Sequence, residues 1–354
     1  MPTDKKLIFA VIVLVALGGA VALQQKSQTA DAAAHSVEGE TASLPKLKIT
    51  EDDIKKIDKV DMTRGGDSDT SPRENIVLVK KGDEDWDLEK PTAAKASAST
   101  VKSMLDDLKR LEVKELIDSS KDSYAKYKVS DDKALHAVFY KGKDVVLDAY
   151  FGEDGSRGQM TRIAGHDAVY AVKGYSSYTF NKDAKSWRDK TILKFEENDV
   201  VKVSLEDANG SFTFDKTGDD WKAKFAKPKG TPADLDKFDK SKLESLIRAY
   251  KALSAADFGD GKTAADTGLD KPLATLTFGM KDGGKTAVTF GGTAESNRWI
   301  QKSGSEQIWS VSSWAGDWAT ANVDKFQKTE EKKDADKDKK DDKKKPPSSI
   351  TVKE

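Results

Sequence analysis

The sequence predicts an α+β protein made of two tandem repeats, each a mostly antiparallel sheet with one principal helix. Residues 151–175 and 290–314 align without a gap, and each segment opens with Phe-Gly. A lone Trp follows an acidic turn in both copies, at Trp86 and Trp221. Each copy also has one apolar stripe at helical spacing, which indicates one amphipathic helix per repeat.

Composition narrows the class of protein. The 354 residues include 60 Lys and Arg against 61 Asp and Glu, for a formal net charge of −1. This balance gives no electrostatic argument for a nucleic-acid partner, and we expect none. The chain has no Cys, which excludes disulfides, thiolate metal sites, a Cys nucleophile and a lipid-modified N-terminal Cys.

The N-terminus carries a membrane signal. Lys5 and Lys6 precede residues 7–23, a run without a charged or polar side chain. A cleaved signal peptide with a small-residue site at residues 20–22 is one interpretation, but its apolar region would be long. An uncleaved anchor over residues 1–24 fits the length better. We therefore expect a single-pass inner-membrane protein whose bulk is periplasmic.

Two polar segments flank the predicted repeats. Residues 25–50 are mostly small and polar and predict a flexible tether. Residues 328–354 form a charged tail, in which almost every side chain from 328 to 345 is charged. With almost nothing apolar to bury, we expect this tail to be disordered. The first repeat then occupies residues 51–195 and the second occupies residues 196–327.

Within each repeat the order of predicted elements is the same. A strand leads into a hairpin with an acidic turn, and a Pro closes this part of the sheet. The predicted strands are 59–63, 76–79 and 86–88 in the first copy and 200–205, 212–214 and 221–225 in the second, and the closing residues are Pro91 and Pro228. Turn-rich residues between two apolar runs are typical of a hairpin.

The principal helix of each repeat follows that Pro. The stripes are Val101, Met104, Leu105, Leu108 and Leu111 in copy one and Leu243, Leu246, Ile247, Tyr250 and Leu253 in copy two. Both place apolar side chains on one face of a helix. Ser241 with Glu244 has the spacing of a capping box. A second hairpin and a strand ending in aromatic-x-Val complete each repeat.

Two motifs resemble a known family. Residues 187–195 (Trp-Arg-Asp-Lys-Thr-Ile-Leu-Lys-Phe) look like the aromatic-Arg-Asp-Lys junction of a bacterial envelope family catalogued only as a domain of unknown function. Residues 267–272 (Thr-Gly-Leu-Asp-Lys-Pro) are similar to its Tyr-Gly-Leu-Asp-x-Pro turn, for which residues 127–129 are the nearest counterpart in copy one. The resemblance covers roughly residues 50–327. It implies one N-terminal membrane span and an accessory role beside ABC transporters of the gliding-motility type, and it carries over no catalytic residues.

Motifs that could bind a cofactor or a metal have simpler interpretations. Residues 279–286 match a phosphate-binding loop, but a strand follows at once where that loop needs a helix. We therefore expect a Gly-rich hairpin and no nucleotide. His35, His136 and His166 share no close spacing, so we expect neither a metal site nor a cofactor.

Aromatic residues gather in the second repeat. In the gapless alignment of the two copies, Trp299, Trp309, Trp314 and Trp318 stand opposite Met160, Tyr170, Tyr175 and Thr179. Trp309 and Tyr170 are interpreted as core residues of the closing strand. Trp299, Trp314 and Trp318 are the candidate ligand-binding residues, because aromatics are enriched in binding sites.

Three functions remain open on the sequence. The first is a non-enzymatic, membrane-anchored extracytoplasmic accessory or scaffold protein of an ABC-type transport or motility complex, whose partners are transporter subunits or other envelope proteins. The second is an envelope ligand-binding module for cell-wall glycan that uses the aromatics of the second repeat. The third is an exported hydrolase, which lacks a Gly-x-Ser-x-Gly elbow. The first is preferred, and no catalytic residue is assigned.

Overall fold

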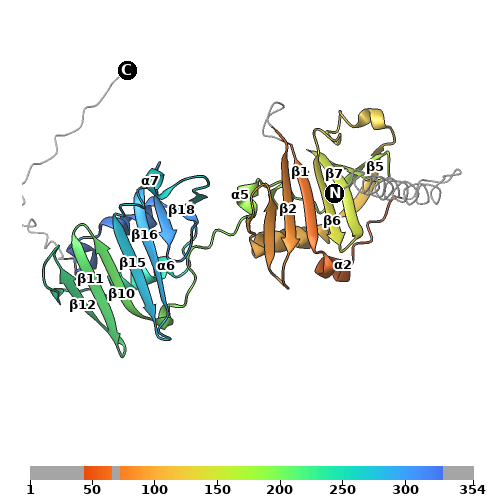
Figure 1. Ribbon diagram of the computed structural model, residues 1–354. Coiled ribbons are helices and arrows are strands. Elements are labelled where there is room, and N and C mark those ends of the chain that lie inside the picture. Colours follow the sequence, from red (N-terminus) through yellow and green to blue (C-terminus); the bar gives the residue numbers. More distant parts are fainter. Residues whose placement is uncertain (1–43, 66–71, 330–354) are drawn as a thin grey trace, which may run out of the picture. The chain divides into compact units, whose positions relative to one another are not determined.

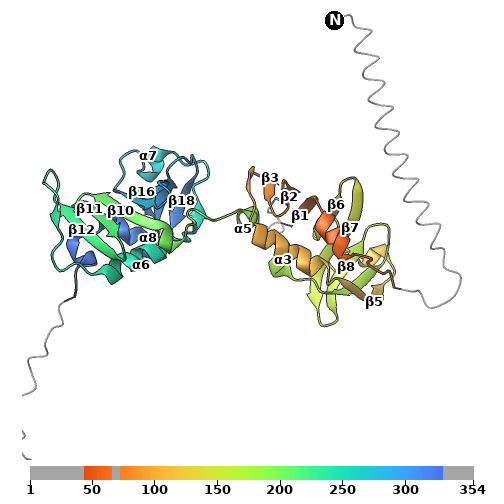
Figure 2. The same cartoon turned by 90° about the horizontal axis from the view of Figure 1, so that it is seen from below.

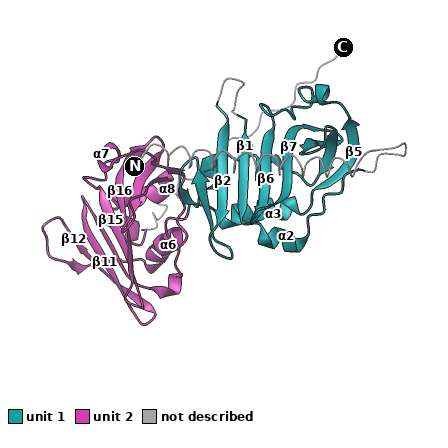
Figure 3. Cartoon of the chain, turned by 45° about the vertical axis from the view of Figure 1, so that its right-hand side comes forward, with its two compact units in different colours: residues 1–190 teal, residues 191–354 magenta. Residues whose placement is uncertain are grey.

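The computed structural model describes residues 44–65 and 72–329. The chain divides into two compact units, unit 1 of residues 1–190 and unit 2 of residues 191–354, coloured teal and magenta in Figure 3. The predicted membrane anchor of residues 1–24, residues 25–43 of the predicted tether and the tail from residue 330 lie outside the described residues. Within the described residues, no helix combines the length and apolar character needed to cross a membrane.

In the described part of unit 1, nine strands form one antiparallel sheet in the order β4-β3-β2-β1-β6-β7-β8-β9-β5 (Figure 1). They are β1 (Lys59–Arg64), β2 (Glu74–Lys80), β3 (Trp86–Lys90), β4 (Ala94–Lys95), β5 (Glu112–Asp118), β6 (Leu135–Lys141), β7 (Asp144–Gly155), β8 (Gly158–Ile163) and β9 (Val169–Lys173). The short helix α2 (Glu51–Lys56) precedes β1, and α3 (Ala98–Leu108) connects the two edge strands β4 and β5. Figure 2 shows α3 along one face of this sheet.

Unit 2 repeats this arrangement, with the order β13-β12-β11-β10-β15-β16-β17-β18-β14 among its described residues. Its strands are β10 (Val200–Asp207), β11 (Gly210–Thr217), β12 (Asp220–Ala226), β13 (Ala233–Asp234), β14 (Asp257–Phe258), β15 (Ala274–Met280), β16 (Lys285–Ala294), β17 (Asn297–Lys302) and β18 (Ile308–Val311). The helix α6 (Lys240–Tyr250) takes the place of α3. Strands β1 to β9 therefore correspond in order to β10 to β18, which confirms a duplicated antiparallel module with few helices.

Each core forms between the principal helix and one face of its sheet. In β1, Val60 and Met62 are buried while the alternate residues face the other side of the sheet. On α3, Val101, Met104 and Leu108 are fully buried. The equivalent stripe on α6 is buried as Leu243, Leu246, Ile247 and Tyr250. The helical spacing in the sequence thus located both cores correctly.

Helix α6 does not begin as the sequence predicted. Its N-cap is Asp239, whose carboxylate accepts a hydrogen bond from the backbone N–H of Ser241 at 3.0 Å. The predicted capping box of Ser241 and Glu244 is therefore wrong. An Asp two residues upstream reaches the free N–H groups of the first turn and leaves Ser241 inside the helix.

The duplicated Phe-Gly pair has a steric explanation. Phe151 and Phe290 are buried in their cores. A Cβ on Gly152 would lie 2.2 Å from the carbonyl oxygen of Tyr127, and a Cβ on Gly291 would lie 2.2 Å from that of Thr267. Only glycine allows the loop to approach this close to the strand.

The loop that makes this approach is the turn on which the family resemblance rests. Gly268 has a φ of 70°, and Lys128 holds the equivalent left-handed conformation at 55°. The next residues, Leu269 and Val129, are both buried. The two turns therefore have the same backbone, although only the second has the Gly-Leu-Asp-x-Pro sequence.

The end of each repeat also closes on its principal helix in the same way. The carbonyl oxygen of Trp187 accepts a hydrogen bond from the N–H of Ser97 at 2.8 Å, and that of Phe326 accepts one from Asp239 at 2.8 Å. Trp187 and Phe326 are fully buried. The Trp-Arg-Asp-Lys junction thus has a counterpart in residues 326–329 at the end of unit 2.

Candidate docking groove

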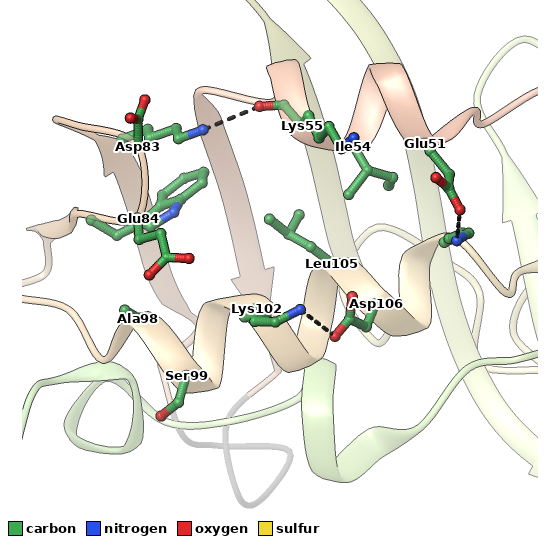
Figure 4. Close-up of a pocket in the computed structure, with 13 residues that line it drawn as sticks. Glu51, Ile54, Lys55, Asp83, Glu84, Ala98, Ser99, Lys102, Leu105 and Asp106 are labelled. Atoms are coloured by element: carbon green, nitrogen blue, oxygen red, sulfur yellow. Dashed lines mark hydrogen bonds and ion pairs between the residues drawn. The ribbon is translucent and has the colours of Figure 1, made fainter.

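Unit 1 has a groove of about 850 Å³ between α2, the β2–β3 hairpin and α3 (Figure 4). Its lining residues are Glu51, Ile54, Lys55, Lys80, Asp83, Glu84, Trp86, Ala98, Ser99, Lys102, Leu105, Asp106 and Lys109. This volume lies within the range of about 300–1,000 Å³ that is typical of ligand pockets. Sequence reasoning did not identify the groove, because its walls come from three segments with no motif in common.

Local sequence signals position the helical walls. Thr50 and Asp53 form a reciprocal capping box that starts α2. Ser97 caps α3 by accepting a hydrogen bond from the N–H of Thr100 at 3.3 Å. Both helices therefore begin at fixed points beside the hairpin, and the groove has a defined width.

The floor of the groove is apolar. Trp86 is only 4% exposed, and Ile54 and Leu105 are partly buried hydrophobic residues packed against the core. The indole N–H of Trp86 has no hydrogen-bond acceptor in the part of the chain that the structure describes. An apolar side chain of a ligand can pack on this floor, and a backbone carbonyl can accept from the indole.

The rim carries both charged pairs and open carboxylates. Lys102 pairs with Asp106 at 3.0 Å, and Lys109 pairs with Glu51. The hydrogen bond from Lys109 lowers the pKa of the Glu51 carboxyl below its ordinary value. Asp83 and Glu84 on the hairpin turn form no ion pair with any described residue. Lys55 and Lys80 also line the groove without an ion pair to a described residue, and Nζ of Lys80 donates to the carbonyl oxygen of Lys55 at 3.1 Å. The lining therefore carries lysines and carboxylates in equal number.

The equivalent position in unit 2 is bridged. Lys240, the first residue of α6, donates a hydrogen bond from Nζ to the carbonyl oxygen of Asp219 in the β11–β12 turn at 2.6 Å. The residue at this position in α3 is Ala98, whose methyl group cannot reach the hairpin. The groove of unit 1 is thus open where a lysine crosses in unit 2.

Two ion pairs ahead of the first strand are common to both units. In unit 1, Glu51 pairs with Lys109, and Asp53 pairs with Lys141 at 2.7 Å. In unit 2 the corresponding pairs are Glu197–Lys251 at 2.7 Å and Asp199–Lys281 at 2.6 Å. Hydrogen bonds from Lys141 and Thr50 hold the pKa of Asp53 far below its ordinary value. These pairs belong to the scaffold, since both copies have them.

The three predicted ligand-binding tryptophans differ in exposure. Trp314 is 61% exposed. Trp318 is half-buried, with its ring centroid 5.6 Å from that of Phe326, and Trp299 is half-buried on β17. Within the described residues none of the three makes a ring contact with another. The structure does bury Trp309 and Tyr170 in the two cores, as predicted.

The gapless alignment of the repeats ends before Trp314. Tyr175 stacks on Phe151 at 4.5 Å between ring centroids, whereas Trp314 is exposed on the short helix α8 (Ser313–Gly316). The residue at the same place in unit 1 is Tyr178 on α4 (Ser177–Phe180), which is 85% exposed. Unit 1 has three extra residues after its closing strand, so the pairing of Tyr175 with Trp314 was wrong.

His136 lies on β6 and His166 in the loop after β8, whereas His35 lies outside the described residues. His136 Nε2 is 2.8 Å from Asp148 Oδ1, and its ring stacks on Tyr150 with 4.0 Å between centroids. Among the described residues, no group of three or more His, Cys, Asp or Glu side chains has the arrangement of a metal site. Residues 281–284 form the turn of the β15–β16 hairpin, which confirms the predicted Gly-rich hairpin.

Comparison with known proteins gives one match. The model of a family described as a domain of unknown function (DUF4340) matches residues 86–272 and 237–338. The first of these matches alone spans more than half of the chain. No match to a curated protein or to a solved structure was found.

Proposed function

The chain belongs to the DUF4340 family, and we propose that it is a non-enzymatic accessory or scaffold protein of the cell envelope that docks a partner protein in the groove of unit 1. The apolar run of residues 7–23 supports an inner-membrane anchor with the two units in the periplasm. The resemblance of the junction and the turn to a family encoded beside ABC transporters supports transporter or motility subunits as partners.

One observation carries the choice of site. Ala98 leaves the groove open where Lys240 joins the helix to the hairpin in unit 2. The two repeats otherwise share strand order, closing contacts and ion pairs. The lysine bridge thus distinguishes unit 2 from unit 1 at this position, and its absence supports the groove of unit 1 as the docking site.

The chemistry of the groove defines the partner segment. Its floor of Ile54, Trp86 and Leu105 accepts an apolar side chain. The carboxylates of Asp83 and Glu84 can accept a Lys or Arg beside that side chain, because neither forms an ion pair with a described residue. We therefore propose an extended, basic-apolar segment of a partner protein as the occupant.

Site-specific cross-linking from membranes tests the proposal. A photoreactive residue at Ser99, on the rim of the groove, should capture ABC transporter subunits or another envelope protein in the full-length protein. The same residue at Ser241, the equivalent position on α6, is the matched control and should capture markedly less.

Closing the groove should remove the capture. Ala98→Lys introduces the lysine of unit 2 at an exposed position, so the fold should persist while the cross-link at Ser99 is lost. Lys240→Ala should leave that cross-link unchanged. Equal capture at Ser99 and Ser241, or capture that survives Ala98→Lys, would show that the groove is not the docking site.

A second candidate is the envelope ligand-binding module. The exposure of Trp314 favours it, because a large aromatic ring that is 61% exposed is available for stacking. Binding to purified cell-wall glycan should then decrease in Trp314→Ala. Unchanged binding in this variant would show that Trp314 does not bind the glycan. The ring of Trp318 already packs against Phe326.

A further inference from the structure

A second cavity of unit 1, separate from the groove, lies beside the Phe-Gly strand. It has a volume of about 320 Å³, at the lower end of the range for small-molecule sites. Phe151, Tyr175, Gln159, Asp154, Asn181 and Arg64 are among its lining residues. Its wall therefore combines an aromatic surface with amide, carboxylate and guanidinium groups.

Two polar atoms of the wall have no partner in the part of the protein that the structure describes. Gln159 is only 5% exposed, and its Nε2 donates to the carbonyl oxygen of Gly152 at 2.8 Å. Its Oε1 accepts no hydrogen bond from the described residues. The hydroxyl of Tyr175 also makes no hydrogen bond to a described residue. Both atoms are accessible and not sealed in the core, so they can bond to a ligand that both donates and accepts.

The charges in the wall favour a neutral ligand. Arg64 pairs with Glu74 at 3.3 Å, and its Nε donates to Asn181 Oδ1 at 3.3 Å. Lys133 and the carboxylate of Asp154 also line the cavity. With cations and an anion present together, a free anion or cation would meet a like charge, whereas neighbouring hydroxyl groups can donate to and accept from both.

The aromatic part of the wall is suited to a ring with an apolar face. The rings of Phe151 and Tyr175 stack at 4.5 Å, and those of Tyr175 and Phe180 stack at 5.1 Å. Ser177 lines the cavity and is followed by Tyr178, which is 85% exposed.

Unit 2 does not have these features. Arg298 stands in the place of Gln159, and its guanidinium donates to the carbonyl oxygen of Gly291 at 3.1 Å. The side chain of Arg298 also packs so closely on Gly316 that a Cβ there would lie 2.7 Å from it. Tyr175 has no counterpart, because it belongs to the three-residue insertion of unit 1.

From this geometry we propose that the cavity of unit 1 binds one unit of a saccharide, a neutral hexose or N-acetylhexosamine. Gln159 Oε1 accepts from one sugar hydroxyl, and the hydroxyl of Tyr175 bonds to another. Asp154 and Asn181 bind neighbouring hydroxyls, and the half-buried ring of Tyr175 contacts the apolar face of the sugar.

The test measures binding of glucose and N-acetylglucosamine to the detergent-solubilised full chain by saturation-transfer NMR and titration. At least one of them should bind at millimolar concentration. Tyr175→Phe removes a single hydroxyl and should weaken binding about five-fold, the effect of one neutral hydrogen bond. Tyr140→Phe makes the same chemical change in β6 away from the cavity and should have no effect.

Filling the cavity gives a second, independent readout. Gln159→Arg supplies the side chain of unit 2, which makes the same bond to the Phe-Gly carbonyl, and it should abolish binding with little change in melting temperature. If neither sugar binds to the wild type, or if binding is unchanged in both variants, the proposal is wrong. Cross-linking at the groove is independent of both results.

Discussion

Units 1 and 2 have equivalent ion pairs but differ at the first residue of the principal helix. The pairs Glu51–Lys109 and Glu197–Lys251 occupy the same place ahead of the first strand. At the start of the principal helix, however, Ala98 leaves a groove where Lys240 bridges to the hairpin. The two units therefore share an ion pair ahead of the first strand and differ at the start of the principal helix.

The exposed faces of the two sheets show the same divergence. On unit 1 the ring of His136 stacks on Tyr150 with an interplanar angle of 3°, and the guanidinium carbon of Arg162 lies 3.6 Å from the centre of the Tyr150 ring. These three residues are cross-strand neighbours. The corresponding row on unit 2 is Thr275, Thr289 and Gln301. The scaffold therefore tolerates either a stacked row or small polar residues on this face.

If both units require glycine at the Phe-Gly contact, replacing that glycine by alanine should destabilise the two units equally. Gly152→Ala and Gly291→Ala each place a methyl group 2.2 Å from a carbonyl oxygen, and each should lower the free energy of unfolding by about 3 kcal/mol. Urea unfolding followed by circular dichroism measures this. Gly292→Ala is the control, because its nearest neighbour would be 3.5 Å away. If Gly152→Ala or Gly291→Ala lowered the free energy of unfolding no more than the control, the two contacts would not be equivalent.

One hydrogen bond in each unit joins the principal helix to the segment after the closing strand, and we expect the two bonds to differ in strength. In unit 1, Thr179 donates to the buried carboxylate of Asp107 at 2.7 Å. In unit 2, Tyr250 donates to the carbonyl oxygen of Ala315 at 2.5 Å. Because hydrogen bonds to charged groups are stronger, Thr179→Val should cost about 2 kcal/mol and Tyr250→Phe about 1 kcal/mol. Chemical denaturation gives both values, and the reverse order would contradict this explanation.

The left-handed turns predict effects of opposite sign. Lys128 holds a φ of 55° where unit 2 has Gly268. Lys128→Gly relieves the strain of a left-handed lysine and should raise the stability of unit 1 by about 0.5 kcal/mol, after the entropic cost of glycine. Gly268→Ala should lower the stability of unit 2 by about 1 kcal/mol. Differential scanning calorimetry measures the stability of both variants. A destabilised Lys128→Gly variant would show that Lys128 is not strained.

The smallest effect should come from the shared ion pairs and should depend on pH. Lysine hydrogen bonds lower the pKa of Glu51 and of Glu197 below the ordinary value of 4.5. A lowered folded-state pKa stabilises the fold above the unfolded value, and this contribution is lost as pH falls through the folded value. Glu51→Gln and Glu197→Gln should therefore reduce the melting temperature slightly at neutral pH and lose this difference in acid.

The control for the acid experiment is Glu206→Gln, since Glu206 makes no ion pair among the described residues. Its melting temperature should follow that of the wild type at every pH. A deficit of Glu197→Gln that grows as the pH is lowered below about 4 would contradict the sign of the linkage.

The sequence by itself determined the duplicated scaffold. Alternation along β1 and the stripe on α3 are local patterns, and they specify which side chains a strand or helix buries wherever it packs. The Phe-Gly pair was also visible as a repeat, although its cause appeared only in the structure, where one loop carbonyl lies against each glycine. The turn that includes Gly268 was not, because its sequence pattern is missing from copy one.

Only the tertiary structure decided where the open sites lie. The groove joins residues as distant in the chain as Glu51 and Lys109, and the saccharide cavity joins Arg64 to Asn181. A three-residue insertion that stacks Tyr175 on Phe151 is invisible in a gapless alignment. Burial follows from periodicity along the chain, whereas a cavity depends on which side chains from separate segments fail to fill a common space.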